Sequence, residues 1–229
     1  MADKPSRALV VYGDGFVPLV HAHIHSLASL ASCGFLSVRA TEEDRSIHEL
    51  ALLLDAHDAT ISERFMGLKA CMFTLGFSVS RIDDLTEELL RLLGFEGGEV
   101  LEKSEFDMVF LHVWIDALVG RVIGVAQTQS RVASRLHLSL ILSYGDIPRG
   151  NSDLCLLRPR QSYTMRGGDI RHHHPMLIAQ WQDAVTRRDT AKQFSFTEFE
   201  EHGVNLAMLA DRFLHEVAFK LWKAPKYGA

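Results

Sequence analysis

Short apolar runs and stretches with helical spacing alternate along most of the chain. Residues 8–12 form an apolar run rich in β-branched side chains, followed directly by a Gly-Asp-Gly turn. Residues 108–113 and 138–142 are also mostly apolar, with His112 and Ser139 as their polar members, and such runs are typical of buried strands. Weaker strand candidates are residues 35–38, 68–73 and 176–179.

Apolar residues spaced three and four positions apart predict helices between these runs. We expect Asp83 or Asp84 to cap the start of one helix, Gly94 to end it, and Gly34 to end the first helix of the chain. The expected helices span residues 24–32, 47–54, 83–93, 116–136, 196–201 and 204–221.

The alternation of strands and helices predicts an α/β fold with a mostly parallel sheet and helices on both faces. The chain has 229 residues, of which 47% are hydrophobic and 23% are charged. This size and composition suit one globular domain with a core that needs no disulfides. We therefore interpret residues 1–229 as a single α/β domain.

Charge and cysteine content narrow the functional classes. The net charge is −5, so no overall positive field favours nucleic acid or an anionic membrane as a partner. No apolar stretch approaches the roughly 20 residues that a membrane-spanning helix needs. Cys33, Cys71 and Cys155 are odd in number and widely separated, which fits a reducing intracellular compartment. The sequence predicts a cytoplasmic protein.

Acidic residues follow three of the predicted strands. Asp14 follows the first apolar run, Asp116 follows the run that contains His112, and Asp146 follows residues 138–142. In parallel sheets, ligands bind outside the carboxyl ends of the strands, and carboxylates are ligands for hard or borderline metal ions. The alternative is that these aspartates only cap turns, where Asp beside Gly is common. Their shared position at strand ends favours a metal site.

Histidines cluster in two places. His172, His173 and His174 are consecutive, and in an extended segment His172 and His174 would point to the same side. Neutral imidazole is a common metal ligand, so these three residues are candidate ligands or phosphate contacts, while the alternative is a solvated loop. For the alternating histidines at positions 21, 23 and 25 we prefer a polar loop without a metal.

Arginines and hydroxyl side chains alternate between residues 158 and 166. Arg158, Arg160 and Arg166 lie in this segment, which ends in Gly-Gly. Guanidinium and hydroxyl groups are suited to binding an oxyanion, so these residues are candidate phosphate contacts, while the alternative is a surface loop with solvated arginines. We interpret Ser62 as a helix cap. The chain lacks a phosphate-binding Gly-rich loop, a nucleophile elbow and a dinucleotide-binding fingerprint.

The order of these segments resembles the cofactor-independent phosphoglycerate mutases, in particular the archaeal-type branch, within the alkaline phosphatase superfamily. Three further segments, ISERFMG, PRQSYTMRG and LHEVAFKLWKAPKYGA, are similar to an uncharacterised group of plant proteins. The segments that carry the mutase resemblance are LVVYGDGF, SLASLASCGFLSV, MGLKACMF, LLRLLGF, FDMVFLHVWIDALVGR, LSLILSYGD, RHHHPMLIA and FTEFEEHGVN.

The resemblance implies an alkaline-phosphatase-like core, two bound metals of the manganese or zinc type, and a serine nucleophile. It assigns Asp14, Asp116, Asp146 and one of His172 to His174 as metal ligands, and a one-residue shift brings Ser46 to the nucleophile position. Two positions depart from the pattern. Arg121 and Ile147 stand where the family has ligand histidines, and neither side chain can coordinate a metal. The domain that closes over the substrate in these mutases is largely missing.

We therefore expect a degenerate phosphoglycerate-mutase-like or phosphatase-like protein that binds a phosphorylated small molecule or a protein partner with little or no turnover. Manganese or zinc is the expected metal if one is retained, and the site could also hold none. One alternative is a small metal-dependent phosphatase or phosphodiesterase. Another is a structural interaction module whose helix at residues 204–221 docks a partner. Whether the chain is an enzyme stays open on these observations.

Overall fold

The computed structural model describes residues 5–13, 22–39, 45–55, 64–74, 82–112, 116–127, 129–143, 173–203 and 207–225. Within these ranges, the backbone but not the side chain is described for residues 39, 45–47, 74, 82–84 and 173–174.

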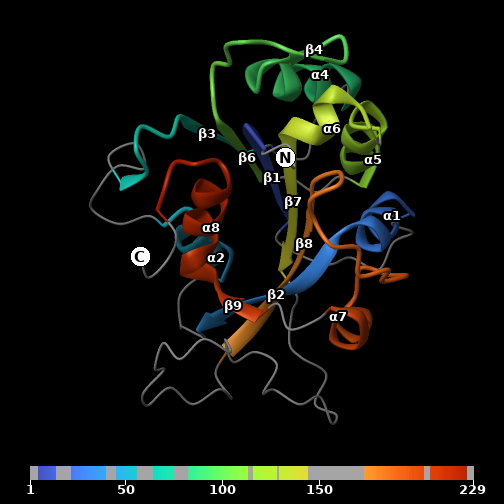
Figure 1. Cartoon of the computed structure of the whole chain (residues 1–229). Coiled ribbons are helices and arrows are strands. Elements are labelled where there is room, and N and C mark those ends of the chain that lie inside the picture. The colour runs from blue at the N-terminus through green and yellow to red at the C-terminus, as the bar shows by residue number, and fades with distance from the viewer. Residues whose placement is uncertain are drawn as a thin grey trace.

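A seven-stranded sheet forms the centre of the described structure (Figure 1). Its strand order is β3-β6-β1-β7-β8-β2-β9, so strands that are distant in sequence lie side by side. In that order, the strands span Ala70–Thr74, Met108–His112, Arg7–Gly13, Leu136–Ser143, His173–Trp181, Ser32–Arg39 and Ala207–Leu209.

The sheet is mostly parallel, which confirms the predicted α/β class. Strands β3, β6, β1 and β7 pair in parallel, and β9 pairs in parallel with β2. Strand β8 is the exception, because it is antiparallel to both β7 and β2. The continuous apolar runs of β1, β6 and β7 are buried on both faces, as is expected for parallel strands that are covered by helices on each side.

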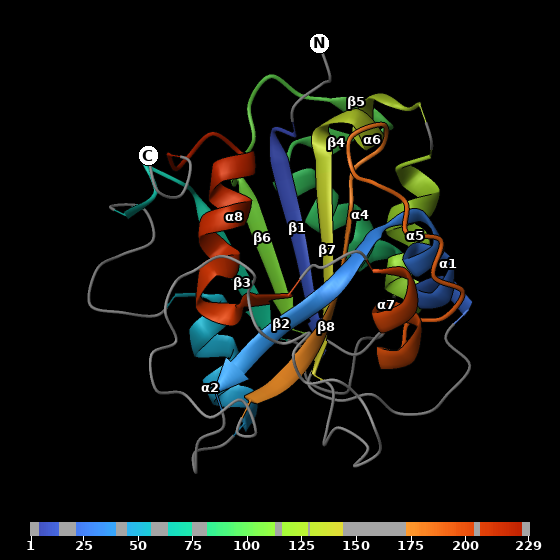
Figure 2. The same cartoon turned by 60° about the horizontal axis from the view of Figure 1, so that its bottom comes forward.

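Helices cover both faces of the sheet, as predicted (Figure 2). On one face, the core joins alternate sheet residues such as Leu9 and Val11 to five helices. On the other face, Val10 and Tyr12 pack with two helices. The first group comprises α1 (Ala22–Leu30), α4 (Ile82–Leu92), α5 (Asp116–Val125), α6 (Arg131–Arg135) and α7 (Phe196–His202), and the second comprises α2 (Arg45–Leu53) and α8 (Phe213–Lys220).

Three local predictions were wrong. The helix expected over residues 116–136 is two helices, α5 and α6, and Leu136 already belongs to β7. The helix expected over residues 204–221 contains the short strand β9, a 3₁₀ turn at Ala210–Arg212 and then α8. Gly34 does not end α1, because it lies inside β2 and pairs with Ile178.

The ends of α4 were predicted closely. The helix begins at Ile82, one or two residues before the expected caps, and Gly94 follows it with φ +76°. Only glycine adopts this left-handed conformation easily, which explains why the helix stops there. A tight hairpin of β4 (Phe95–Glu96) and β5 (Glu99–Val100) comes next. Among the described residues, no helix combines the length and apolar character needed to traverse a lipid bilayer.

Candidate functional site

Four neighbouring strands meet at one edge of the sheet. The parallel strands β6, β1 and β7 end at His112, Gly13 and Ser143, and their ends are aligned by the pairs Tyr12 with His112 and Gly13 with Leu142. Because β8 runs the opposite way, it begins at this same edge, and Met176 pairs with Ser143. We call this edge, formed by the ends of β6, β1 and β7 and the start of β8, the carboxyl edge.

Most of the predicted ligands belong to segments that leave this edge. Asp14 directly follows the last residue of β1, Asp146 comes shortly after β7, and His172 directly precedes β8, although all three lie outside the described residues. The strand order therefore brings Gly13, Ser143 and His173, the described residues nearest to them in sequence, to the same edge of the sheet. Convergence of the side chains themselves stays a prediction. The predicted phosphate contacts Arg158, Arg160 and Arg166, like Ile147 and Ser62, also lie outside the described residues.

Three other predicted residues have a described backbone only. His173 and His174 are the first residues of β8, where they pair with Arg39 and Val38 of β2. Ser46 is the second residue of α2. The two histidines thus occupy the start of β8 at the carboxyl edge, while the directions of the imidazole groups and of the Ser46 hydroxyl are not part of the description.

Asp116 has a structural contact that the sequence did not indicate. It is the first residue of α5, and its carboxylate accepts hydrogen bonds from the backbone N–H groups of Ile24 (2.9 Å) and, more weakly, His23 (3.4 Å). These donors belong to the first turn of α1, whose N–H groups have no partner within the helix. Asp116 therefore caps α1, although it lies 92 positions after Ile24 in the sequence. His23 lies in α1, and not in the loop that we had preferred for it.

The remaining candidates do not add a metal site in the described part of the chain. Arg121, which the resemblance aligns with a ligand histidine, is exposed in the middle of α5. Across the residues that the structure describes, no group of three or more His, Cys, Asp and Glu side chains is arranged to hold a metal ion.

A buried carboxylate lies beneath the carboxyl edge. Glu49 of α2 is fully buried, and its two carboxylate oxygens accept separate hydrogen bonds. Tyr12 donates its hydroxyl to Oε2 at 2.7 Å, and Ser143 donates its hydroxyl to Oε1 at 3.0 Å. The ring of His112 lies 5.4 Å from the ring of Tyr12. We call Glu49, Tyr12 and Ser143 the carboxylate hub.

The hub connects three elements whose residues are far apart in sequence. Tyr12 and Ser143 lie at the ends of the adjacent strands β1 and β7, and Glu49 holds both hydroxyls to α2. A buried carboxylate is strongly unfavourable unless hydrogen bonds replace its lost hydration, and such bonds are stronger than those between neutral groups. The hub therefore fixes the ends of β1 and β7 relative to the helix that also carries Ser46.

Sequence reasoning missed Glu49, although a signal was present. Glu49 and Leu53 are four residues apart and therefore share one face of α2, and both side chains are fully buried. An acidic residue on the apolar face of a helix requires a polar partner. The partners are contributed by strand ends, so their identity could not be read from the local pattern.

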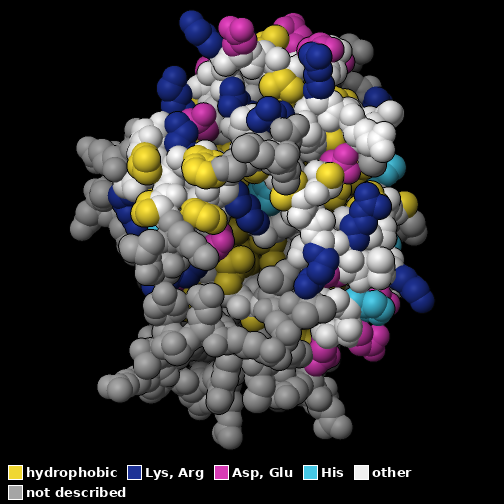
Figure 3. Space-filling model, in the orientation of Figure 1, with side chains coloured by type: hydrophobic (Ala, Val, Ile, Leu, Met, Phe, Trp, Pro, Cys, Tyr) yellow, Lys and Arg dark blue, Asp and Glu magenta, His cyan; other side chains and the backbone are white. Residues whose placement is uncertain are grey.

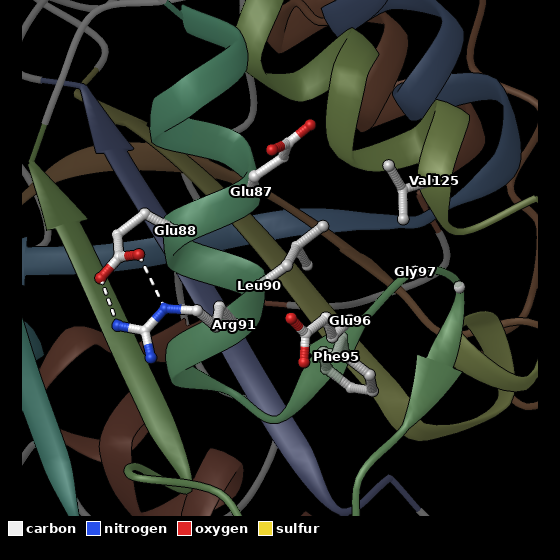
Figure 4. A pocket seen from close by; sticks show the side chains of 9 residues that line it. Glu87, Glu88, Leu90, Arg91, Phe95, Glu96, Gly97 and Val125 are labelled. Carbon is white, nitrogen blue, oxygen red and sulfur yellow. Dashed lines mark hydrogen bonds and ion pairs between the residues drawn. The ribbon is translucent and has the colours of Figure 1, made fainter.

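One cavity of the described structure lies away from the carboxyl edge (Figure 4). It has a volume of about 740 Å³ and lies between α4, the β4–β5 hairpin and the end of α5. Glu87 and Glu96 line it, and Glu88 pairs with Arg91 beside it. The hairpin follows Leu93, whose carbonyl accepts a hydrogen bond from Arg7 at the start of β1. The cavity therefore belongs to the opposite edge of the sheet and contains no nucleophile and no set of metal ligands.

Comparisons with known proteins support the fold only. No protein-family model matches the chain, and no curated protein matches it. Among solved structures, the chain is similar to the PH0037 protein from Pyrococcus horikoshii, with a TM-score of 0.52 and 11% sequence identity over 100% of both chains. At this identity the likeness supports a common α/β architecture and carries no function to this chain.

Proposed function

We propose that this chain binds a phosphorylated ligand at the carboxyl edge, with little or no turnover. The observation that carries the proposal is the strand order β6-β1-β7-β8. It brings the ends of β1 and β7 and the start of β8 to one edge, where open α/β sheets bind their ligands, and Asp14, Asp146 and His172 are close to these strand ends in sequence. The arginines at positions 158, 160 and 166 lie in the connection between β7 and β8, both of which have an end at this edge.

Two observations favour binding over catalysis. Arg121 is exposed on α5, so the position that the resemblance assigns to a ligand histidine carries a permanent positive charge. Asp116 caps α1 through both carboxylate oxygens, which gives that residue a structural role independent of any metal. With one ligand position replaced and another engaged in capping, a complete two-metal centre has fewer donors than its chemistry requires.

A metal-dependent phosphatase or phosphodiesterase is the second candidate, and the carboxylate hub favours it. A buried carboxylate repels a phosphate group placed directly beside it, whereas a metal cation between the two would attract both. Glu49 lies beneath the ends of β1 and β7, from which Asp14 and Asp146 follow. Manganese or zinc held by Asp14, Asp146 and a histidine would then polarise the phosphate ester.

The packing of the C-terminal helix argues against its use as a docking site for a protein partner. The apolar side chains of α8, Phe213, Leu214, Val217 and Ala218, are buried against the sheet of the same chain. A helix face that is already packed is not available for a partner. If a protein partner is bound, we expect it to carry the phosphorylated group to the carboxyl edge.

Calorimetric titration of the full chain with inorganic phosphate and with 3-phosphoglycerate tests the proposed function. We expect saturable binding, and we expect Arg160→Ala and Arg166→Ala each to weaken it about tenfold because a charge-assisted contact is lost. Arg131→Ala is the matched control, since Arg131 is exposed on α6 and pairs with Glu99 at the surface. Absence of binding for both ligands, or equal binding by all variants, would contradict the proposal.

Metal analysis and a phosphatase assay separate the two candidates. After incubation with manganese or zinc and removal of excess metal, the binding function predicts less than one metal per chain and no release of phosphate from 4-nitrophenyl phosphate. Stoichiometric metal, together with turnover that Asp14→Ala and Asp146→Ala both abolish, would establish the hydrolase instead.

A further inference from the structure

A lysine points into the interior on the face of the sheet that α8 covers. Lys220, the last residue of α8, is partly buried and donates a hydrogen bond from Nζ to Oε1 of Gln180 on β8 at 3.0 Å. Phe213, Val217 and Lys220 are spaced four and three residues apart, so Lys220 continues the buried stripe of the helix. The hydrogen bond to Gln180 therefore holds the amine against the sheet.

A polar network continues from Gln180 into the sheet. The amide Nε2 of Gln180 lies 3.4 Å from Oγ of Ser139 and 3.4 Å from Nε2 of His137, and the last two residues are fully buried on β7. Among the described residues, His137 Nδ1 has no hydrogen-bond partner. Networks that serve packing alone usually satisfy their buried polar atoms, so this arrangement calls for another explanation.

In the described part of the chain, the amine is not paired with a carboxylate. Within the described part of the chain, no carboxylate lies within ion-pairing distance of Nζ, and the hydrogen bond to Gln180 is its one polar contact. Burial lowers the pKa of Lys220 to about 8, although the nearby Glu216 acts in the opposite direction. Burial, and secondly the charge of Lys220, hold the pKa of His137 well below its usual value. The network is thus neutral apart from the lysine.

This cluster is separate from the carboxyl edge. His137 is near the start of β7 and Ser143 is at its end, so the two positions are about 20 Å apart along the strand. Figure 3 shows that this face of the molecule is hollowed between α8 and strands β7 and β8, with hydrophobic and charged side chains around the hollow. The hydrogen bond from Lys220 to Gln180 also runs from α8 to β8, on the side of the sheet that α8 covers.

We propose that Lys220 is a nucleophilic amine that condenses with small aldehydes in the hollow between α8 and the sheet. Desolvation without a counter-ion is an established way to make a lysine nucleophilic near neutral pH. The Nζ lone pair bonds to the carbonyl carbon, the π pair of the carbonyl moves to oxygen, and the proton released by nitrogen passes to that oxygen. Loss of water from the carbinolamine then leaves a C=N bond.

Reductive alkylation of the full chain tests this proposal. Acetaldehyde is added with sodium cyanoborohydride, which reduces the imine, and peptide mapping by mass spectrometry follows ethylation of each lysine. Lys192 is the internal control because it is exposed. At pH 7.5 we expect Lys220 to react about tenfold faster than Lys192, since its larger neutral fraction outweighs its restricted access. The rate of Lys220 ethylation should level off above pH 8.

A near-isosteric variant tests the missing counter-ion. Gln180→Glu places a carboxylate where the amide oxygen lies, so we expect ethylation of Lys220 at pH 7.5 to slow about tenfold while that of Lys192 is unchanged. If this variant does not fold, the comparison of Lys220 with Lys192 in the wild type still tests the proposal. Slower reaction of Lys220 than of Lys192 at pH 7.5 would overturn the proposal. The proposal would also be overturned if Lys220 reacts slowly and inorganic phosphate slows its ethylation further. Such a result would mean that the lysine contacts an anion.

Discussion

Replacement of Lys220 by methionine should change how the stability of the protein depends on pH. The amine has a pKa of about 8 in the folded chain and the ordinary lysine value of 10.5 when unfolded. Between these values the unfolded chain binds more protons than the folded chain, so wild-type stability rises with pH. Methionine has a similar length and no titrating group, so Lys220→Met lacks this contribution.

The size of the effect follows from the two pKa values. At pH 7 the shift of 2.5 units destabilises the wild type by about 3 kcal/mol, and at pH 9.5 the remaining penalty is about 1 kcal/mol. The stability of Lys220→Met relative to the wild type should therefore fall by about 2 kcal/mol from pH 7 to pH 9.5. Loss of the hydrogen bond to Gln180 shifts the comparison by a constant amount and leaves this difference unchanged.

Urea denaturation at several pH values, followed by circular dichroism, measures the difference directly. Lys192→Met is the control, because Lys192 is exposed and its variant should follow the wild type in parallel. Parallel curves for Lys220→Met and the wild type between pH 7 and pH 9.5 would refute the reasoning. They would mean that the Lys220 amine is solvated in the folded state, and the proposed nucleophile would lose its physical basis.

Three further predictions concern the hub, a helix contact and the thiols. Tyr12→Phe removes a hydroxyl from the carboxylate hub and should lower the unfolding free energy by about 1–3 kcal/mol in urea; a loss below about 0.5 kcal/mol would contradict the importance of the hub. Gly120→Ala should destabilise by about 1–3 kcal/mol, since its Cβ would lie 2.5 Å from the α1 imidazole. The control Gly124→Ala has open space and should stabilise by about 0.5–1 kcal/mol; equal effects of the two variants would exclude the contact. Burial raises the pKa of Cys33 to about 12 and that of the less buried Cys71 to about 11. At pH 8 we therefore expect a disulfide reagent to modify Cys33 only on unfolding and Cys71 slowly. Rapid modification of Cys33 in the folded chain would disprove this prediction.

The elements that were predicted well are those whose local sequence pattern is compatible with only one type of secondary structure. The apolar runs of β1 and β6 are too short for core helices and too apolar for an exposed surface, so a buried strand was the natural interpretation. The helix α4 combines a strong amphipathic pattern with a terminal glycine that takes a positive φ. Both signals act within a few residues.

The break between α5 and α6 shows where local patterns fail. Gln129 has φ +67°, and its N–H donates to Asp183 at 2.6 Å. Ser130 then caps α6 by accepting a hydrogen bond from Ala133 N–H at 3.0 Å. Asp183 follows β8 and is 54 residues away from Gln129. A continuous apolar periodicity across residues 116–136 could not reveal that a distant carboxylate stabilises a turn in the middle.

The polar positions of β7 illustrate the same limit. In the sequence LHLSLILS, leucines alternate with His137, Ser139 and Ser143, a pattern that is typical of a strand with one face in water. All eight residues are nevertheless buried, because helices cover both faces. Ser143 therefore meets Glu49, and Ser139 meets Gln180, only after strands and helices have packed. Burial of a polar side chain depends on what covers it, and that covering comes from elsewhere in the chain.

The sequence alone determined that this chain forms an α/β sheet protein, and it identified most of the longer strands and helices, because side-chain spacing within an element reflects its own backbone geometry. Tertiary structure decided the strand order, the reversed direction of β8 and the partners of Glu49 and Lys220. These features arise from contacts between residues that are tens of positions apart. Their energies depend on the whole packed core, and local periodicity contains no information about them.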